Sequence, residues 1–185
     1  CRLMHHNNET LDCLMMERDM RSYRAADVPD QTGNTFVVTG ANTGIGFDTA
    51  RILSARGARV LLGCRSERKA TEAINRISTE TPNADIIWLP LDLSSLASVS
   101  RAAERANQED RIDGLINNAG VMVPPRTMTE DGFELQFGVN HLGYFMMTKT
   151  FLPLLKATEG SRIINTASEA HRMANLKLNN LNWEN

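Results

Sequence analysis

The stretch VVTGANTGIG, residues 37–46, carries the strongest signal for the fold in this sequence. It is an apolar, β-branched run that leads into three glycines, Gly40, Gly44 and Gly46, and the last two stand where a helical pattern begins. Glycine lets the backbone turn sharply and lets a ligand approach without a Cβ in the way. The N–H groups and the dipole of a helix N-terminus favour a bound pyrophosphate. A glycine triplet between a strand and a helix therefore predicts a dinucleotide site, and a tight turn without a ligand is the open alternative.

Around this turn the chain alternates short β-branched runs with helical patterns. Strands are expected over 35–40, 58–64, 85–91, 113–120 and 161–168, and helices over 47–57, 66–78, 94–108 and about 133–156. Ser66 is the expected N-cap of the second helix, and Gly57 is expected to end the first. Such alternation is typical of βαβ units, so the predicted fold class is α/β, a Rossmann-type doubly wound parallel sheet of about five strands.

This pattern also predicts the domain organisation. It starts near Thr35, is lost after Ala170 and contains no internal repeat. Residues 1–32 lack the basic start and continuous apolar core of a signal peptide, and we expect them to form a flexible or artefactual leader. Residues 33–185 are expected to form a single dinucleotide-binding domain.

Composition and charge narrow the class of protein. The chain has 185 residues, of which 42% are hydrophobic and 23% are charged, and its net charge is −2. The interspersed charges argue against a nucleic-acid partner, because phosphate neutralisation needs a concentrated basic face. No apolar run reaches the roughly 18 residues of a membrane span. The three cysteines form no C-x-x-C motif, so we expect reduced thiols, no metal site and a cytoplasmic location.

The end of the second predicted strand, GCRSERK, bears on the choice of cofactor. An acid at this point would accept a hydrogen bond from the 2′-OH of NAD, and none is present at Gly63 or Cys64. Arg65 follows directly, and a guanidinium can bind a 2′-phosphate through its planar fork. NADP(H) is therefore the preferred cofactor, with NAD(H) possible, and the alternative is that Arg65 is a solvated strand-end residue.

Five ordered motifs resemble those of the short-chain dehydrogenase/reductase family: TGANTGIG (39–46), LDLS (91–94), NNAG (117–120), VNHLGYF (139–145) and IINTAS (163–168). The glycine spacing is similar to that of this family and differs from that of sugar-nucleotide epimerases. GCRSERK, VNHLGYF and SEAH are similar to the retinol-dehydrogenase-like branch. The resemblance implies an NADP(H)-dependent oxidoreductase that interconverts a carbonyl and an alcohol of a small-molecule substrate by hydride transfer.

The resemblance also implies roles for individual residues. The pyrophosphate loop would be formed by Gly40, Asn42, Thr43, Gly44, Ile45 and Gly46. Asp92 and Leu93 would contact the adenine, while Asn118, Ala119 and Gly120 would line the cofactor and Asn117 would tie neighbouring strands together. Asn140 would interrupt the long helix and hold a water of a proton relay, and Ser168 would donate a hydrogen bond to the substrate carbonyl. A solvated helical asparagine and a capping serine are the structural alternatives for these last two.

The proton donor that such a reaction needs is absent from the sequence. In the family this donor is the tyrosine of a Y-x-x-x-K motif that follows the position of Ser168. The two tyrosines, Tyr23 and Tyr144, have no lysine four residues later. We therefore expect an N-terminal piece of a longer enzyme, with the last strands and helices of the fold missing, inactive by itself and prone to aggregate. The resemblance implies that the full-length protein is a homo-oligomer.

One hypothesis of a different class is left open by this absence. A non-catalytic NADP(H)-binding module that regulates a partner would need the glycine loop and Arg65 but no Tyr/Lys pair.

Overall fold

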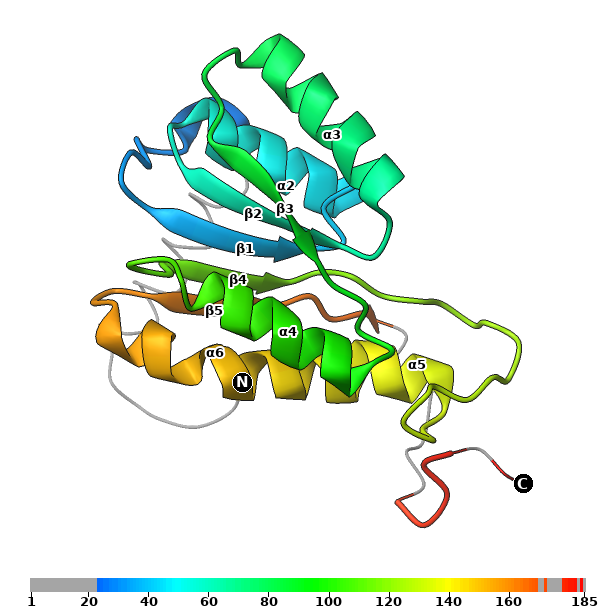
Figure 1. Cartoon of the computed structure of the whole chain (residues 1–185). Helices are drawn as coiled ribbons and strands as arrows, with labels where there is room; N and C mark the ends of the chain where they lie inside the picture. Colours follow the sequence, from blue (N-terminus) through cyan, green and yellow to red (C-terminus); the bar gives the residue numbers. More distant parts are fainter. Residues whose placement is uncertain (1–22, 170–171, 173–177, 183, 185) are drawn as a thin grey trace, which may run out of the picture.

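Five parallel strands form the centre of the structure, a computed structural model that describes residues 23–169, 172, 178–182 and 184 (Figure 1). Their order in the sheet is β3-β2-β1-β4-β5, and every neighbouring pair is parallel. The bounds are Thr35–Thr39 for β1, Arg59–Cys64 for β2, Ile86–Pro90 for β3, Gly114–Asn117 for β4 and Arg162–Asn165 for β5. The predicted α/β fold with a doubly wound parallel sheet is confirmed.

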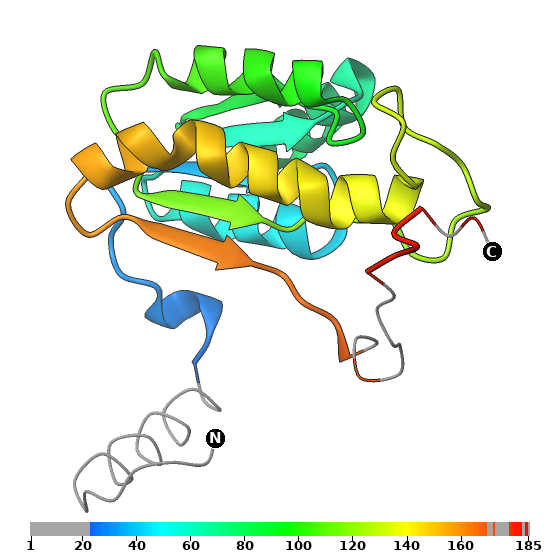
Figure 2. The same cartoon turned by 90° about the horizontal axis from the view of Figure 1, so that it is seen from below.

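Helices cover both faces of this sheet (Figures 1 and 2). One face carries α2 (Gly44–Ala55) and α3 (Glu67–Glu80), and the other carries α4 (Leu96–Ala106) and α6 (Tyr144–Ala157). A short helix α5 (Leu135–Phe137) and a π-helical segment η2 (Gly138–Gly143) run directly into α6. The long helix expected near residues 133–156 is therefore one rod with a wider π-helical stretch inside it, and Asn140 lies in that stretch.

The hydrophobic core is divided into two clusters by the sheet itself. Val37 packs in the cluster under α4 and α6, whereas its neighbour Val38 packs in the cluster under α2 and α3. Leu115 and Ile116 of β4 separate in the same way. Successive side chains of a strand point to opposite faces, so a sheet covered on both sides requires continuous apolar strands. The runs TFVVT and RVLLGC satisfy that requirement.

Two helix boundaries follow from residues that the sequence analysis singled out. The Ser66 hydroxyl accepts a hydrogen bond from the backbone N–H of Lys69 at 3.4 Å, which makes Ser66 the N-cap of α3 as predicted. Gly57 follows the end of α2 with a φ of 84°, a left-handed conformation that favours glycine. The start of α2 was predicted too late, because glycines disfavour helices and Gly44 and Gly46 were assigned to the turn.

The ends of the described chain contact this fold at two places. Residues 1–22 of the predicted leader lie outside the described residues. In its remaining part, the backbone carbonyls of Ala25 and Ala26 accept hydrogen bonds from Arg56 at the end of α2. At the other end, Asn182 contacts the loop before α5, and Figure 2 shows this segment in red beside the yellow-green loop. No helix among the described residues has both the length and the apolar character needed to cross a bilayer.

Candidate functional site

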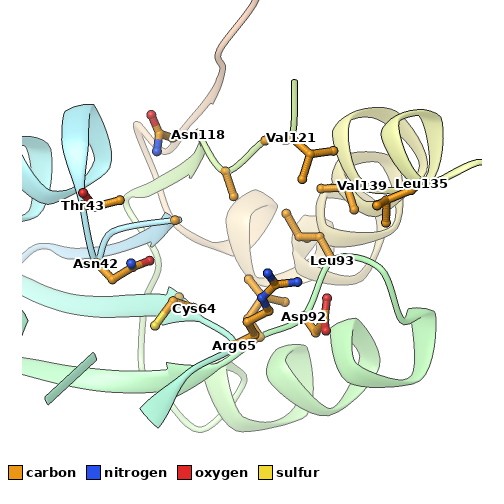
Figure 3. Close-up of a pocket in the computed structure, with 15 residues that line it drawn as sticks. Asn42, Thr43, Cys64, Arg65, Asp92, Leu93, Asn118, Val121, Leu135 and Val139 are labelled. Atoms are coloured by element: carbon orange, nitrogen blue, oxygen red, sulfur yellow. The ribbon is translucent and has the colours of Figure 1, made fainter. Parts of the chain in front are cut away.

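A cavity of about 430 Å³ opens at the carboxyl ends of the strands, where β1 and β4 lie side by side. This is the point at which the strand order reverses, and open α/β sheets bind their ligands in the crevice there. Figure 3 shows Arg65 and Asp92 on one side of the pocket and Asn118 and Val121 on the opposite side. Fifteen residues line it: Gly40, Asn42, Thr43, Gly63, Cys64, Arg65, Leu91, Asp92, Leu93, Asn118, Ala119, Gly120, Val121, Leu135 and Val139.

The glycine loop packs so closely against the loop after β4 that side chains are excluded from it. A Cβ on Gly40 would lie 2.9 Å from the Cα of Ala119, and Gly40 has a φ of 67°. A Cβ on Gly46 would lie 2.6 Å from the carbonyl oxygen of Gly40 and 2.5 Å from Asn118 Nδ2. Real Cβ atoms do not approach other atoms this closely, so both positions require glycine. The two loops together form the base of the pocket.

The N-terminus of α2 faces this base without a side-chain cap. Thr43 is the N-cap residue, but its side chain accepts no hydrogen bond from the first turn. Gly44 has a φ of 57°, and a Cβ there would meet no atom within 4 Å. Uncapped N–H groups beside open space suit an anionic group, because the helix dipole adds positive potential there. The residues present therefore fit the pyrophosphate of a dinucleotide. Gly44, Ile45 and Gly46 belong to this helix start and do not line the cavity itself.

A buried threonine that the sequence analysis overlooked joins the two loops. The side chain of Thr39 is fully buried, and its hydroxyl accepts hydrogen bonds from the backbone N–H groups of Asn118 at 2.8 Å and Ala119 at 2.9 Å. The Asn118 side chain returns a bond from Nδ2 to the Thr39 carbonyl at 3.0 Å. Thr39 is the last residue of β1, so these bonds fix the end of β1 to the loop after β4. Asn117, one residue earlier, donates from Nδ2 to Asn165 Oδ1 at 2.8 Å and thereby links β4 to β5 as expected.

The ends of β2 and β3 supply the polar side of the pocket. The Arg65 side chain is exposed and forms no ion pair with any described residue. Asp92 Oδ1 accepts hydrogen bonds from the backbone N–H of Ser94 at 2.9 Å and from its hydroxyl at 2.7 Å. Burial raises the pKa of the Cys64 thiol, which favours its neutral form. A guanidinium with no ionic partner is therefore available to an anionic ligand.

Asn140 fixes the wall on the opposite side of the pocket from behind. Its Oδ1 accepts from the backbone N–H of Val121 at 2.9 Å, and its Nδ2 donates to the Val121 carbonyl at 2.8 Å. These two bonds hold one wall of the cavity against the π-helical segment η2. Asn140 itself does not line the cavity. Ser168 follows β5, is exposed and also lies outside the lining.

The Tyr144 side chain contacts the loop after β4. Its hydroxyl donates a hydrogen bond to the backbone carbonyl of Ala119. Burial raises the pKa of Tyr144 to about 12, and a hydrogen bond with Thr39 only partly offsets this effect. A phenol with so high a pKa is a weak acid near neutral pH, in agreement with its exclusion as the proton donor.

The lining contains six residues that the sequence analysis did not assign: Gly63, Cys64, Leu91, Val121, Leu135 and Val139. Three of them, Cys64, Leu91 and Val121, are direct neighbours of assigned residues, and Gly63 lies two positions before Arg65 in the same motif. Leu135 and Val139 belong to the rod of α5 and η2, and only its placement beside the loop after β4 brings them to the pocket. Among the described residues there is no group of three side chains that could hold a metal ion.

Comparisons with known proteins agree with this geometry. A family model described as short chain dehydrogenase matches residues 34–180. Retinol dehydrogenase 13 of Homo sapiens is 50% identical over 153 residues, which cover 82% of this chain and 46% of the relative. The chain spans about half the length of the curated relatives it matches.

Two solved structures are similar to this one. A crystal structure of a protein from Mycobacterium Paratuberculosis has a TM-score of 0.75 and 40% identity, over 88% of this chain and 56% of that chain. A structure from Escherichia coli CFT073, described as a short chain dehydrogenase complexed with NADPH, has a TM-score of 0.67 and 29% identity, over 84% of this chain and 66% of that chain.

Proposed function

The chain belongs to the short-chain dehydrogenase family, and from this premise we propose that it forms the NADP(H)-binding part of an oxidoreductase that interconverts a carbonyl and an alcohol. The observation that carries the proposal is the pocket at the ends of β1 and β4. Its base is the glycine loop, and its other side carries Arg65, which has no ionic partner in the described part of the chain. When bound, the nicotinamide cofactor supplies or accepts the hydride. The similar structure complexed with NADPH and the relative named retinol dehydrogenase support the same assignment.

Each part of the pocket has a role in this proposal. The first turn of α2, with Gly40, Asn42, Thr43, Gly44, Ile45 and Gly46, binds the pyrophosphate through backbone N–H groups. Asp92 accepts from the adenine amino group beside Leu93, and Asn118, Ala119 and Gly120 line the rest of the cofactor. Arg65 binds the 2′-phosphate and thereby favours NADP(H) over NAD(H). This preference is supported by the lack of any acid at Gly63 or Cys64.

The test of the cofactor preference compares two neighbouring arginines. Arg65→Ala is expected to raise the Kd for NADPH about 10- to 100-fold, because a hydrogen bond to a charged group contributes about 1.5–3 kcal/mol. The Kd for NADH should change less than about twofold, since NADH has no 2′-phosphate. Arg68→Ala is the matched control, because Arg68 pairs with Glu72 on the exposed face of α3 and does not line the pocket. Equal losses of NADPH and NADH binding, or an equal effect of the control, would contradict the assignment.

For the chemical step we propose two residues of this chain. Ser168 donates a hydrogen bond to the substrate carbonyl, and Asn140 holds a water of the proton relay. The chain itself is expected to bind NADPH without oxidising it, because the sequence has no Y-x-x-x-K motif and Tyr144 is a weak acid bound to Ala119. Oxidation of NADPH by the purified chain with any aldehyde, followed at 340 nm, would overturn that expectation.

The non-catalytic NADP(H) sensor is the second candidate, and absence of a Y-x-x-x-K motif from the complete product of the gene would favour it. Carbonyl reduction by the complete product of the gene would exclude the sensor. A homo-oligomeric full-length protein and a cytoplasmic location stay predictions of the sequence.

A further inference from the structure

Val123 has a backbone conformation that a β-branched residue rarely adopts. Its φ is 46°, and among the described residues it is the one non-glycine with a positive φ. The left-handed region is sterically unfavourable for such a residue, so the surrounding structure must hold it there. Packing does not do so, because the Val123 side chain is 85% exposed.

A hydrogen bond from the neighbouring helix holds Val123 instead. Gln136 in α5 accepts through its side-chain Oε1 from the backbone N–H of Val123 at 2.8 Å. Gln136 is itself fixed, since its backbone N–H donates to the buried carboxylate of Glu134 at 2.8 Å. The backbone N–H of Glu134 in turn donates to Asn182 Oδ1 at 3.0 Å. The acceptor that faces Val123 therefore belongs to an ordered chain of hydrogen bonds.

Two adjacent rows of side chains on the rod of α5 and η2 contribute to the pocket. Leu135 and Val139 line the cavity directly. Gln136 and Asn140, each one residue later, hold the backbone at Val123 and Val121. The wall that begins at Gly120 is thus fixed at two points only two residues apart.

We propose that Gln136 is a positioning residue of the dinucleotide site, which acts by holding Val123 in the left-handed conformation. This inference rests on the proposed function, because it takes NADP(H) as the ligand of the pocket. When Val123 is held in this conformation, the wall at Gly120 and Val121 already has its cofactor-binding shape before the cofactor binds. Without the Gln136 acceptor, Val123 relaxes to an extended conformation, and binding must then restore the strained one. Preorganisation of this kind raises affinity without a direct contact to the ligand.

The test replaces Val123 by glycine, because glycine adopts the left-handed conformation without strain and then does not need the Gln136 hydrogen bond. Gln136→Ala is expected to raise the Kd for NADPH about fivefold, measured by fluorescence titration. Val123→Gly should bind NADPH within about twofold of wild type, since glycine adopts a positive φ without strain. In the double variant Gln136→Ala/Val123→Gly the Kd should stay near that of Val123→Gly, so the two changes do not add. Gln108→Ala, an exposed glutamine away from the pocket, is the matched control and should bind like wild type.

A merely structural role for Gln136 would give a different pattern, in which its loss weakens binding equally with Val123 or Gly at position 123. That additivity, or normal binding by Gln136→Ala, would overturn this inference alone. Failure of the wild-type chain to bind NADPH would overturn the proposed function and this inference together. If Gln136→Ala fails to fold in a urea titration, the double variant decides, because we expect it to fold and to bind.

Discussion

The hydroxyl of Thr39 accepts a hydrogen bond from the backbone N–H of Asn118 at 2.8 Å, although the two residues are 79 positions apart in the chain. This bond, with its companion from the N–H of Ala119, fixes the end of β1 to the loop after β4 inside the protein. Both loops form the base of the nucleotide pocket, so one buried hydroxyl sets their relative position.

Thr39→Val removes this hydroxyl at almost constant volume and leaves two partly buried N–H groups without their acceptor. We expect a loss of about 2 kcal/mol in the free energy of unfolding, since an unsatisfied buried donor costs about 1–3 kcal/mol. NADPH binding should weaken as well. Urea unfolding and fluorescence titration measure the two effects. Thr39→Ser keeps the hydroxyl and should lose much less stability, and equal losses for the Val and Ser variants would contradict the role of the hydroxyl.

Gly46 is a position where a methyl group has no room. Gly46→Ala places a Cβ 2.6 Å from the Gly40 carbonyl, so the glycine loop must move. We expect this variant to lose NADPH binding and about 1–3 kcal/mol of stability, as for other overpacked sites. Gly33→Ala is the control, because its φ of 83° costs stability while its Cβ would meet no atom within 4 Å. The control should still bind NADPH, as isothermal titration calorimetry can show.

Cys64 lines the pocket with a thiol whose pKa is raised by burial. The reactive thiolate is therefore scarce near pH 8, and we expect iodoacetamide to alkylate Cys64 about tenfold more slowly than a free cysteine. The rate should keep rising with pH above 9, and saturating NADPH should slow it further. Mass spectrometry of the peptide that contains Cys64 measures the rate. Unchanged alkylation in the presence of bound NADPH would place the ligand elsewhere.

Asp113 links stability to acid pH at the opposite end of the sheet. Burial alone would raise the pKa of Asp113, but hydrogen bonds from Arg111 and from the Thr35 N–H outweigh burial and lower that pKa. A lowered pKa stabilises the fold above the ordinary pKa of aspartate, about 3.9, and this contribution is lost as the pH falls through the lower folded pKa. Asp113→Asn should therefore cost about 1.5 kcal/mol at pH 7 and less at pH 3.

The control for this prediction is the exposed carboxylate of Asp48, whose side chain is 62% exposed beside Arg51. Asp48→Asn should change the stability by less than about 0.5 kcal/mol at either pH. Urea midpoints at pH 7, 5 and 3 compare the variants. A cost of Asp113→Asn that does not depend on pH would contradict the linkage.

The sheet could be predicted from the sequence because its strands are continuously apolar and because a glycine marks the turn after β1. Val37 and Val38 are both apolar, as a strand covered on two faces requires, and Gly40, the first residue after the strand, has a positive φ. Nine of the twelve residues assigned to the cofactor line one pocket, because motifs at the ends of parallel strands meet at one edge of the sheet. Their roles toward a cofactor stay predictions.

Other features depend on contacts that no local pattern contains. A threonine at the end of a strand is common, and only the packing of β1 beside β4 makes Thr39 an acceptor for two N–H groups. The capping of α5 by Glu134 and the strained Val123 depend on where the loop 121–134 folds back. The fifth strand was predicted too long, since its pairing with β4 ends at Asn165.

The position of β1 between β2 and β4 in the sheet has a consequence for how the chain folds. In β1, Phe36 pairs with Val60 of β2 nearby in sequence, whereas the contacts of β1 with the β4 side span 77 to 80 positions. Closing a loop of that length costs entropy before the new contacts compensate, and such long-range pairings slow folding. We expect β1, β2 and β3 to assemble first with α2 and α3, and the β1–β4 pair to close late. The contact between Gly40 and Ala119 belongs to that late step, so a newly made chain acquires its nucleotide pocket only as folding ends.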